Sequence, residues 1–163
     1  MARLACPTGN ALWGYANMDR ILKLLAWPAA LFIAYIFLWY EQYKLTGDPG
    51  SVALFTILTD GFGLHGFEKP MRLGVATAEI TASILVVLPW TRLYGGILAF
   101  IIISGALFFH LVYPLGIDPI GDGGQLFTHA VEVWLCAVFV LVAWRRELSG
   151  LVYRITGWRL LPA

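Results

Sequence analysis

Four long apolar runs constrain this chain more than any other feature of its sequence. They lie at about residues 21–42, 72–90, 93–113 and 125–144. A helix that crosses a bilayer needs about 20 mostly apolar residues, and each run has roughly that length. The 163 residues are 60% hydrophobic and 13% charged, whereas soluble domains have about 25% charged residues. The sequence therefore predicts an all-α fold, an integral membrane four-helix bundle spanning residues 21–144.

The remaining segments form two tails and one long connection. Residues 1–20 are predicted to be an N-terminal tail, with Asn17 or Asp19 as the start of the first helix. The connection 43–71 contains SVALFTIL, which is too short to span and is expected to lie on the surface or dip back into the membrane. In the tail 145–163, apolar residues at helical spacing predict an amphipathic helix at the membrane interface: Leu148, Leu151, Val152, Ile155 and Trp158.

The distribution of basic residues predicts the orientation of the bundle. Four spans place both termini on one side, and that side would hold eight of the eleven basic residues: Arg3, Arg20, Lys23, Arg92, Arg145, Arg146, Arg154 and Arg159. The other side would hold Lys44, Lys69 and Arg72. Because cytoplasmic loops carry the excess of Lys and Arg, we expect both termini in the cytoplasm. The net charge of +1, without a basic stripe, gives no indication of a nucleic-acid partner.

Four ionisable residues lie inside the apolar runs: Glu79, His110, His129 and Glu132. Intramembrane ionisable side chains usually face the bundle or a water-filled cavity. Counted along each helix at about 1.5 Å per residue, the two carboxylates lie about 10 Å below the outer ends of their helices, and the two imidazoles about 5–6 Å below. All four are expected in the outer half of the membrane, and Lys44 is expected to reach over the mouth of this cluster.

Helical spacing predicts which faces turn inward. Glu79 lies in a small and polar stripe with Arg72, Ala76 and Ser83. A mostly small stripe of Gly96, Ala99, Ile103 and Ala106 leads to His110. Small residues mark contacts between membrane helices, so both side chains are expected to point at other helices. In the last run, the expected inward face contains His129, Glu132, Val133 and Cys136.

Several interpretations of the cluster stay open. The polar groups can simply hydrogen-bond across helices. Two histidines and two carboxylates can bind zinc or iron, although HxxE is not a metal signature. Two histidines on adjacent helices can ligate haem. Histidine and glutamate can also hydrogen-bond a quinone and exchange protons with it, and a small solute or a proton can be transported. No metal and no intrinsic cofactor is expected, and quinone is the candidate ligand.

The chain resembles the DoxX-like family of small membrane proteins. The resemblance rests on WYEQYKLTGDPG at the end of the first run, RLGVATAEITASILVVLPWTRLYGG across the second, SGALFFHLVYPLGI at the end of the third, and DGGQLF before the fourth. It covers roughly residues 30–145, and neither tail. The Lys, Glu and Gly–Ala…His positions of the family match Lys44, Glu79, Gly105, Ala106 and His110.

The resemblance implies a redox association, because the family is named for a subunit linked to thiosulfate:quinone oxidoreductase. We therefore expect a small accessory subunit in the cell membrane of a bacterium or archaeon. It would contact the bilayer and pack with other membrane subunits or with itself, without being an enzyme on its own. The alternative is a quinone-interacting subunit that uses Lys44, Glu79, His110, His129 and Glu132.

Overall fold

The computed structural model describes residues 9–158, and the side chains from residue 17 on. Six helices and no strands make up this described part: α1 (Gly9–Thr46), α2 (Pro49–Gly61), α3 (Glu68–Val87), α4 (Arg92–Leu111), α5 (Gln125–Ala143) and α6 (Arg145–Thr156). α1, α3, α4 and α5 are long and apolar enough to cross a membrane. The predicted all-α four-helix membrane bundle is confirmed.

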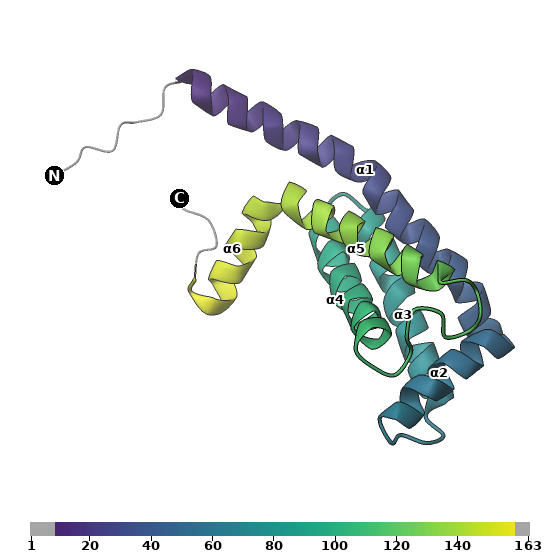
Figure 1. Ribbon diagram of the computed structural model, residues 1–163. Coiled ribbons are helices and arrows are strands. Elements are labelled where there is room, and N and C mark those ends of the chain that lie inside the picture. Colours follow the sequence, from purple (N-terminus) through teal and green to yellow (C-terminus); the bar gives the residue numbers. More distant parts are fainter. Residues whose placement is uncertain (1–8, 159–163) are drawn as a thin grey trace.

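The four spanning helices pack in a ring, because α1 and α4 each contact both α3 and α5. Figure 1 shows α2 at one end of this bundle and α6 at the other. We call these the α2 end and the α6 end; the loop 112–124 lies at the α2 end, and the short turn between α3 and α4 at the α6 end. The core is built from small and aliphatic side chains of all four helices, among them Ala30, Ile33, Ala82, Ala99 and Val133.

The first helix differs most from the sequence prediction. α1 begins at Gly9, so the predicted tail is helical over residues 9–20, and its first turns project beyond the bundle (Figure 1). Asp19 does not cap the helix start; it forms ion pairs with Arg145 at 2.5 Å and with Arg146 at 2.8 Å. These ion pairs tie the extension of α1 to α6. Pro28 lies inside α1 without interrupting it, as membrane helices allow.

The other helix ends lie within a few residues of the predicted ones. α3 begins one turn earlier than expected, at Glu68, and α4 ends at Leu111. SVALFTIL forms most of α2, which begins with Asp48 as its N-cap and Pro49 in its first turn, a favoured combination. The predicted amphipathic helix of the C-terminal tail is α6; Trp158 lies beyond its end. Residues 1–8 and 159–163 of the predicted tails, including Arg3 and Arg159, lie outside the described residues.

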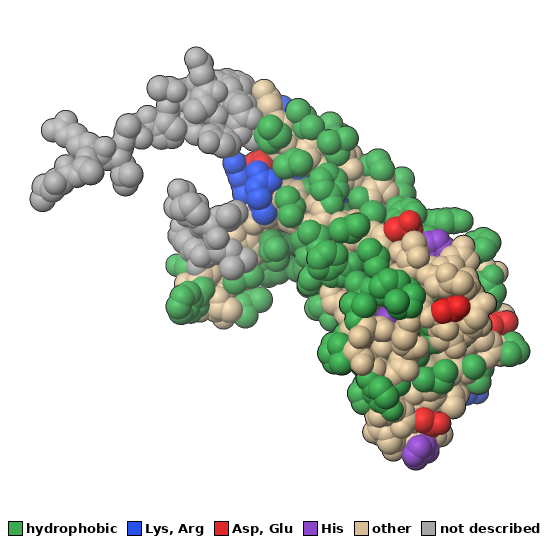
Figure 2. All heavy atoms as spheres, viewed as in Figure 1, with side chains coloured by type: hydrophobic (Ala, Val, Ile, Leu, Met, Phe, Trp, Pro, Cys, Tyr) green, Lys and Arg blue, Asp and Glu red, His purple; other side chains and the backbone are tan. Residues whose placement is uncertain are grey.

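The surface of the bundle between its two ends is apolar, as expected for a surface in contact with lipid. Large apolar side chains cover the helices between the two ends (Figure 2), and many are more than half exposed, such as Leu31, Tyr35, Ile84 and Ile101. In water such an apolar surface would be an aggregation liability. Basic side chains gather at the α6 end (Figure 2). There Lys23 pairs with Glu147, and Arg145 and Arg146 pair with Asp19.

Candidate functional site

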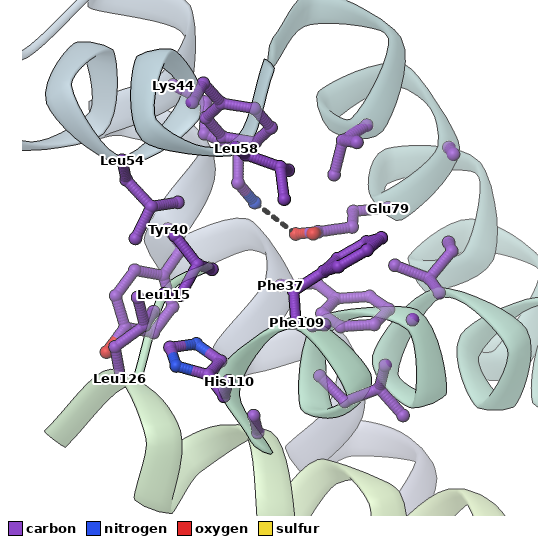
Figure 3. Close-up of a pocket in the computed structure, with 18 of the residues that line it drawn as sticks. Phe37, Tyr40, Lys44, Leu54, Leu58, Glu79, Phe109, His110, Leu115 and Leu126 are labelled. Atoms are coloured by element: carbon purple, nitrogen blue, oxygen red, sulfur yellow. Dashed lines mark hydrogen bonds and ion pairs between the residues drawn. The ribbon is translucent and has the colours of Figure 1, made fainter. Parts of the chain in front are cut away.

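A cavity of about 380 Å³ lies between the helices in the half of the bundle nearer α2. All four spanning helices and α2 contribute to its wall, which is predominantly apolar. Four of the five predicted site residues line it: Lys44, Glu79, His110 and His129. Figure 3 shows the Lys44–Glu79 pair with Phe37, Phe109 and His110 around the same space. An apolar pocket with a few convergent polar groups is the usual form of a small-molecule site.

The cation in this site is Lys44, near the C-terminus of α1. Its ammonium donates to Glu79 of α3 and, at 3.0 Å, to Glu41 one turn earlier on α1. The side chains of Lys44 and Glu79 are only 12% and 10% exposed. Lys44 thus contacts Glu79, one of the residues of the predicted cluster. The three groups carry one positive and two negative formal charges, so the ammonium is shared by two buried carboxylates.

Glu41 was missed as a site residue. The sequence places it near the end of the first run, where long polar side chains reach water cheaply. In the structure it is 4% exposed. Its Oε2 is the one buried side-chain nitrogen or oxygen atom in the described part of the chain that has no hydrogen-bond partner. Its position three residues before Lys44, on the same helix face, is the signal that links it to the cluster.

His110 is held by the loop that follows its own helix. Its Nδ1 lies 2.6 Å from the carbonyl oxygen of Gly116, and because a carbonyl can only accept, Nδ1 carries the hydrogen. In the neutral ring Nε2 is then an acceptor. The ring is 5% exposed and stands edge-on to Phe127 at 5.7 Å between centroids. The predicted inward stripe of α4 is confirmed, since Gly96, Ala99 and Ile103 are buried with it.

Tyr40 and His129 form the third polar feature of the wall. The Tyr40 hydroxyl lies 2.8 Å from His129 Nδ1. If the hydroxyl donates, the neutral imidazole carries its hydrogen on Nε2; if Nδ1 donates, the hydroxyl hydrogen is free. In either arrangement the pair keeps one donor for a ligand. Tyr40 was not among the predicted site residues, because its partner His129 lies on a helix distant in sequence.

Glu132 does not join the cluster, and the prediction that it faces inward is wrong. It is exposed on the surface of α5 and does not line the cavity. The buried face of α5 consists of Ala130, Val133, Ala137 and Val140. Because successive residues turn by about 100° around a helix, Glu132 points well away from Val133, while His129 lies on the edge of the buried face. Glu132 therefore faces lipid or another protein.

The α2 end is closed by α2 and the loop 112–124. Leu54, Phe55 and Leu58 of α2 line the cavity from this side, and Phe55 and Leu58 are almost fully buried. A second hollow of about 230 Å³ lies beyond them. Its wall has a larger polar share than that of the main cavity, because it includes Asp48, Ser51 and Asp122. The two spaces are neighbours and share Tyr40, Lys44, Leu54, Phe55 and Leu126 in their walls.

The site offers little for a metal ion. Among residues 17–158, no group of three or more His, Cys, Asp or Glu side chains is arranged to hold one. What the cavity does offer is one acceptor at His110, one donor from the Tyr40–His129 pair, and a buried ammonium shared by two carboxylates, all set in an apolar wall.

Comparison with known proteins adds no relative to this description. No family model matches the chain, and neither a curated protein nor a solved structure matches it.

Proposed function

We propose that this chain is a membrane subunit that binds a ring-bearing, lipid-soluble molecule of the quinone class in the cavity between its helices. The observation that carries the proposal is the pairing of an apolar cavity with a donor and an acceptor on its wall. A quinone carbonyl would accept from the Tyr40–His129 pair. The hydroxyl of the reduced ring would donate to Nε2 of His110.

The cluster of Lys44, Glu41 and Glu79 supports exchange of protons with such a ring. Two carboxylates and one ammonium leave a formal charge of −1 in a buried place, and an uncompensated buried charge is costly. A proton relieves this cost, so the cluster can take up or release one as the ring changes its own protonation. The polar hollow beyond Tyr40 and Lys44 offers a route to water.

The proposed setting is a redox-associated complex of the cell membrane, as the resemblance to DoxX-like proteins implies. The centre that exchanges electrons with the ring would lie on a partner subunit. The excess of basic residues at the α6 end supports cytoplasmic termini by the positive-inside rule. The cavity would then open in the outer half of the membrane.

Binding of a quinone to the purified protein in lipid nanodiscs tests the proposal. Quenching of tryptophan fluorescence during titration with a short-chain ubiquinone analogue should saturate. The double change Tyr40→Phe, His129→Phe removes the donor pair, and His110→Ala removes the acceptor; each should weaken binding about three- to tenfold, which corresponds to the loss of one hydrogen bond. Glu132→Gln is the matched control, because Glu132 does not line the cavity, and it should bind as the wild type does. Quenching that never saturates, or that is the same in all four proteins, would contradict the proposal.

A second candidate function is that of a non-catalytic accessory subunit that packs against partners. The observation in its favour is Glu132, an exposed carboxylate in the middle of a mostly apolar helix. Acidic side chains inside spans almost always face a bundle interior, a cavity or a partner. Since Glu132 faces none of these in the described part of the chain, a neighbouring membrane helix with a basic or hydroxyl side chain would complete its surroundings.

A further inference from the structure

Helices α3 and α4 are in close contact at the α6 end. A Cβ atom on Gly95 of α4 would lie 2.2 Å from the backbone nitrogen of Val86 on α3, so the two backbones touch there and only glycine fits. Arg92 fixes the same place, because its guanidinium donates to the carbonyl oxygens of Val86 and Val87 at 2.8 Å each. The two helices are therefore closely packed and hydrogen-bonded at this end.

At the α2 end the same two helices leave open space between them. A Cβ atom on Gly74 of α3 or on Gly105 of α4 would meet nothing within 4 Å. Both glycines line the cavity. Gly74 lies six residues after Glu68, and Gly105 six residues before Leu111, so in this antiparallel pair both lie about 9 Å from the α2 end. They face the same level of the gap.

The gap opens the cavity toward lipid. Ile101 of α4 lines the cavity and is nevertheless 61% exposed, and Gly74 is exposed as well. Residues that belong both to the wall and to the outer surface mark a mouth. At about 9 Å from the helix ends, this mouth lies within the hydrocarbon core, which is about 30 Å thick. Only an apolar part of a ligand is stable there.

Most polar groups lie away from the gap. Lys44 and Tyr40 come from α1, and His129 comes from α5. Glu79 and His110 come from α3 and α4, but Glu79 is hydrogen-bonded to Lys44 of α1 and His110 to the loop 112–124. The wall near the mouth consists of glycine, alanine and aliphatic residues of α3 and α4. A ligand that satisfies both sides has a polar head and an apolar extension. The cavity of about 380 Å³ is near the lower end of the usual range for ligand sites. A cavity of this size can hold a ring, whereas a long apolar chain attached to the ring would have to extend out of the cavity.

We infer that the ligand carries an apolar tail that passes between α3 and α4 at Gly74 and Gly105 into the bilayer, and that the ligand enters by the same path. This inference rests on the proposed function and specifies its substrate class as tailed amphiphiles. It also gives the two glycines a role: they select for the tail, because a larger side chain at either position fills the gap through which it passes.

The test compares two probes that differ only in their tail: 2,3-dimethoxy-5-methyl-benzoquinone, which has none, and its 6-decyl derivative. Both are titrated into the full chain in nanodiscs, with concentrations expressed per lipid. The wild type should bind the decyl probe at least about tenfold more tightly. Gly105→Leu should remove most of this advantage and leave the tail-less probe within about threefold of wild type. Gly74→Leu, from the opposite wall, should do the same.

Thr81→Leu is the matched control, since Thr81 is exposed on α3 and does not line the cavity; it should keep the full preference for the decyl probe. Helix content and resistance to unfolding identify any variant that fails to fold, and the second glycine then provides the test. Equal binding of both probes by the wild type, or equal losses for both in the glycine variants, would overturn the inference alone. If neither probe binds the wild type, the proposed function is wrong and the inference falls with it.

Discussion

Lys44 and Glu79 form an ion pair across 35 positions of sequence, and it joins the end of α1 to the middle of α3. Lys44 also donates to Glu41 at 3.0 Å. Arg72, another residue of α3, donates to the backbone carbonyl of Lys44. The polar wall of the cavity is therefore built on a junction that also holds two spanning helices together. Binding and stability depend on the same residues there, and experiments on them have to separate the two.

The sharing of one ammonium by two carboxylates predicts an asymmetry between variants. Lys44→Met leaves Glu41 and Glu79 buried without a counter-ion, and loss of one partner of a buried pair costs about 3–5 kcal/mol. Glu79→Gln keeps the Lys44–Glu41 pair, so we expect a smaller loss, about 1–2 kcal/mol. Unfolding in mixed micelles of increasing SDS fraction, followed by circular dichroism, measures both. Equal losses would contradict the shared arrangement, and the triple change Lys44→Met, Glu41→Gln, Glu79→Gln should recover part of the stability.

The two ends of the α3–α4 pair predict opposite effects of the same substitution. Gly95→Ala forces a methyl group against the backbone of Val86, and overpacking of this kind typically costs about 1–3 kcal/mol or more. Gly105→Ala meets no atom within 4 Å and replaces a glycine inside a helix, so stability should be unchanged or higher by up to about 1 kcal/mol. The same unfolding assay compares them. A large loss for Gly105→Ala would show that the gap is filled in the membrane.

Arg92 predicts a substitution that weakens the fold at the α6 end and leaves the cavity unaffected. It is 1% exposed, donates to two carbonyl groups of α3 and stacks on Trp27 at 3.8 Å from the ring centroid. Lysine keeps the charge and loses the planar fork, so Arg92→Lys should lower the unfolding free energy by about 1–3 kcal/mol. Arg145→Lys, in a partly exposed pair with Asp19, should lose less than about 1 kcal/mol. Quinone affinity should be the same in both.

The spans and two of the inward faces were predictable, because length and small residues decide them. The stripe of Arg72, Ala76, Glu79 and Ser83 is buried as expected, and so is the stripe that ends at His110. In a membrane, both the lipid-facing and the protein-facing sides of a helix are apolar, so hydrophobic periodicity carries little information about rotation. The positions of small and polar residues then have to supply it.

For α5, the polar residues predicted the wrong inward face. His129 and Glu132 suggested one inward face, while Ala130 and Ala137 mark another about 100° away, and the small residues indicate the correct one. The sequence prediction missed Glu41 and Tyr40 for a different reason. Glu41 is linked to Glu79 through Lys44, and Tyr40 pairs with His129. Glu79 and His129 lie on helices distant in sequence, and the order of helices around a bundle is not encoded in local patterns. The cavity itself follows from that order.

Glu132 gives the prediction that separates the two candidate functions. The Glu132 side chain makes no hydrogen bond or ion pair in the described part of the chain, so Glu132→Leu should change the unfolding free energy of the isolated protein by no more than about 0.5 kcal/mol. An acidic side chain near the centre of a span costs about 2.5–3.5 kcal/mol in lipid, which a partner with a basic or hydroxyl group would offset.

The accessory-subunit proposal therefore predicts that Glu132→Leu releases partners in native membranes. Particles extracted into nanodiscs without detergent should lose mass, as measured by mass photometry, and Glu132→Gln should lose less because an amide still hydrogen-bonds. Val142→Leu, another exposed position on α5, is the matched control and should leave the mass unchanged. Unchanged particles for Glu132→Leu would contradict a partner at this position, while quinone binding by the same variant would remain as in the wild type.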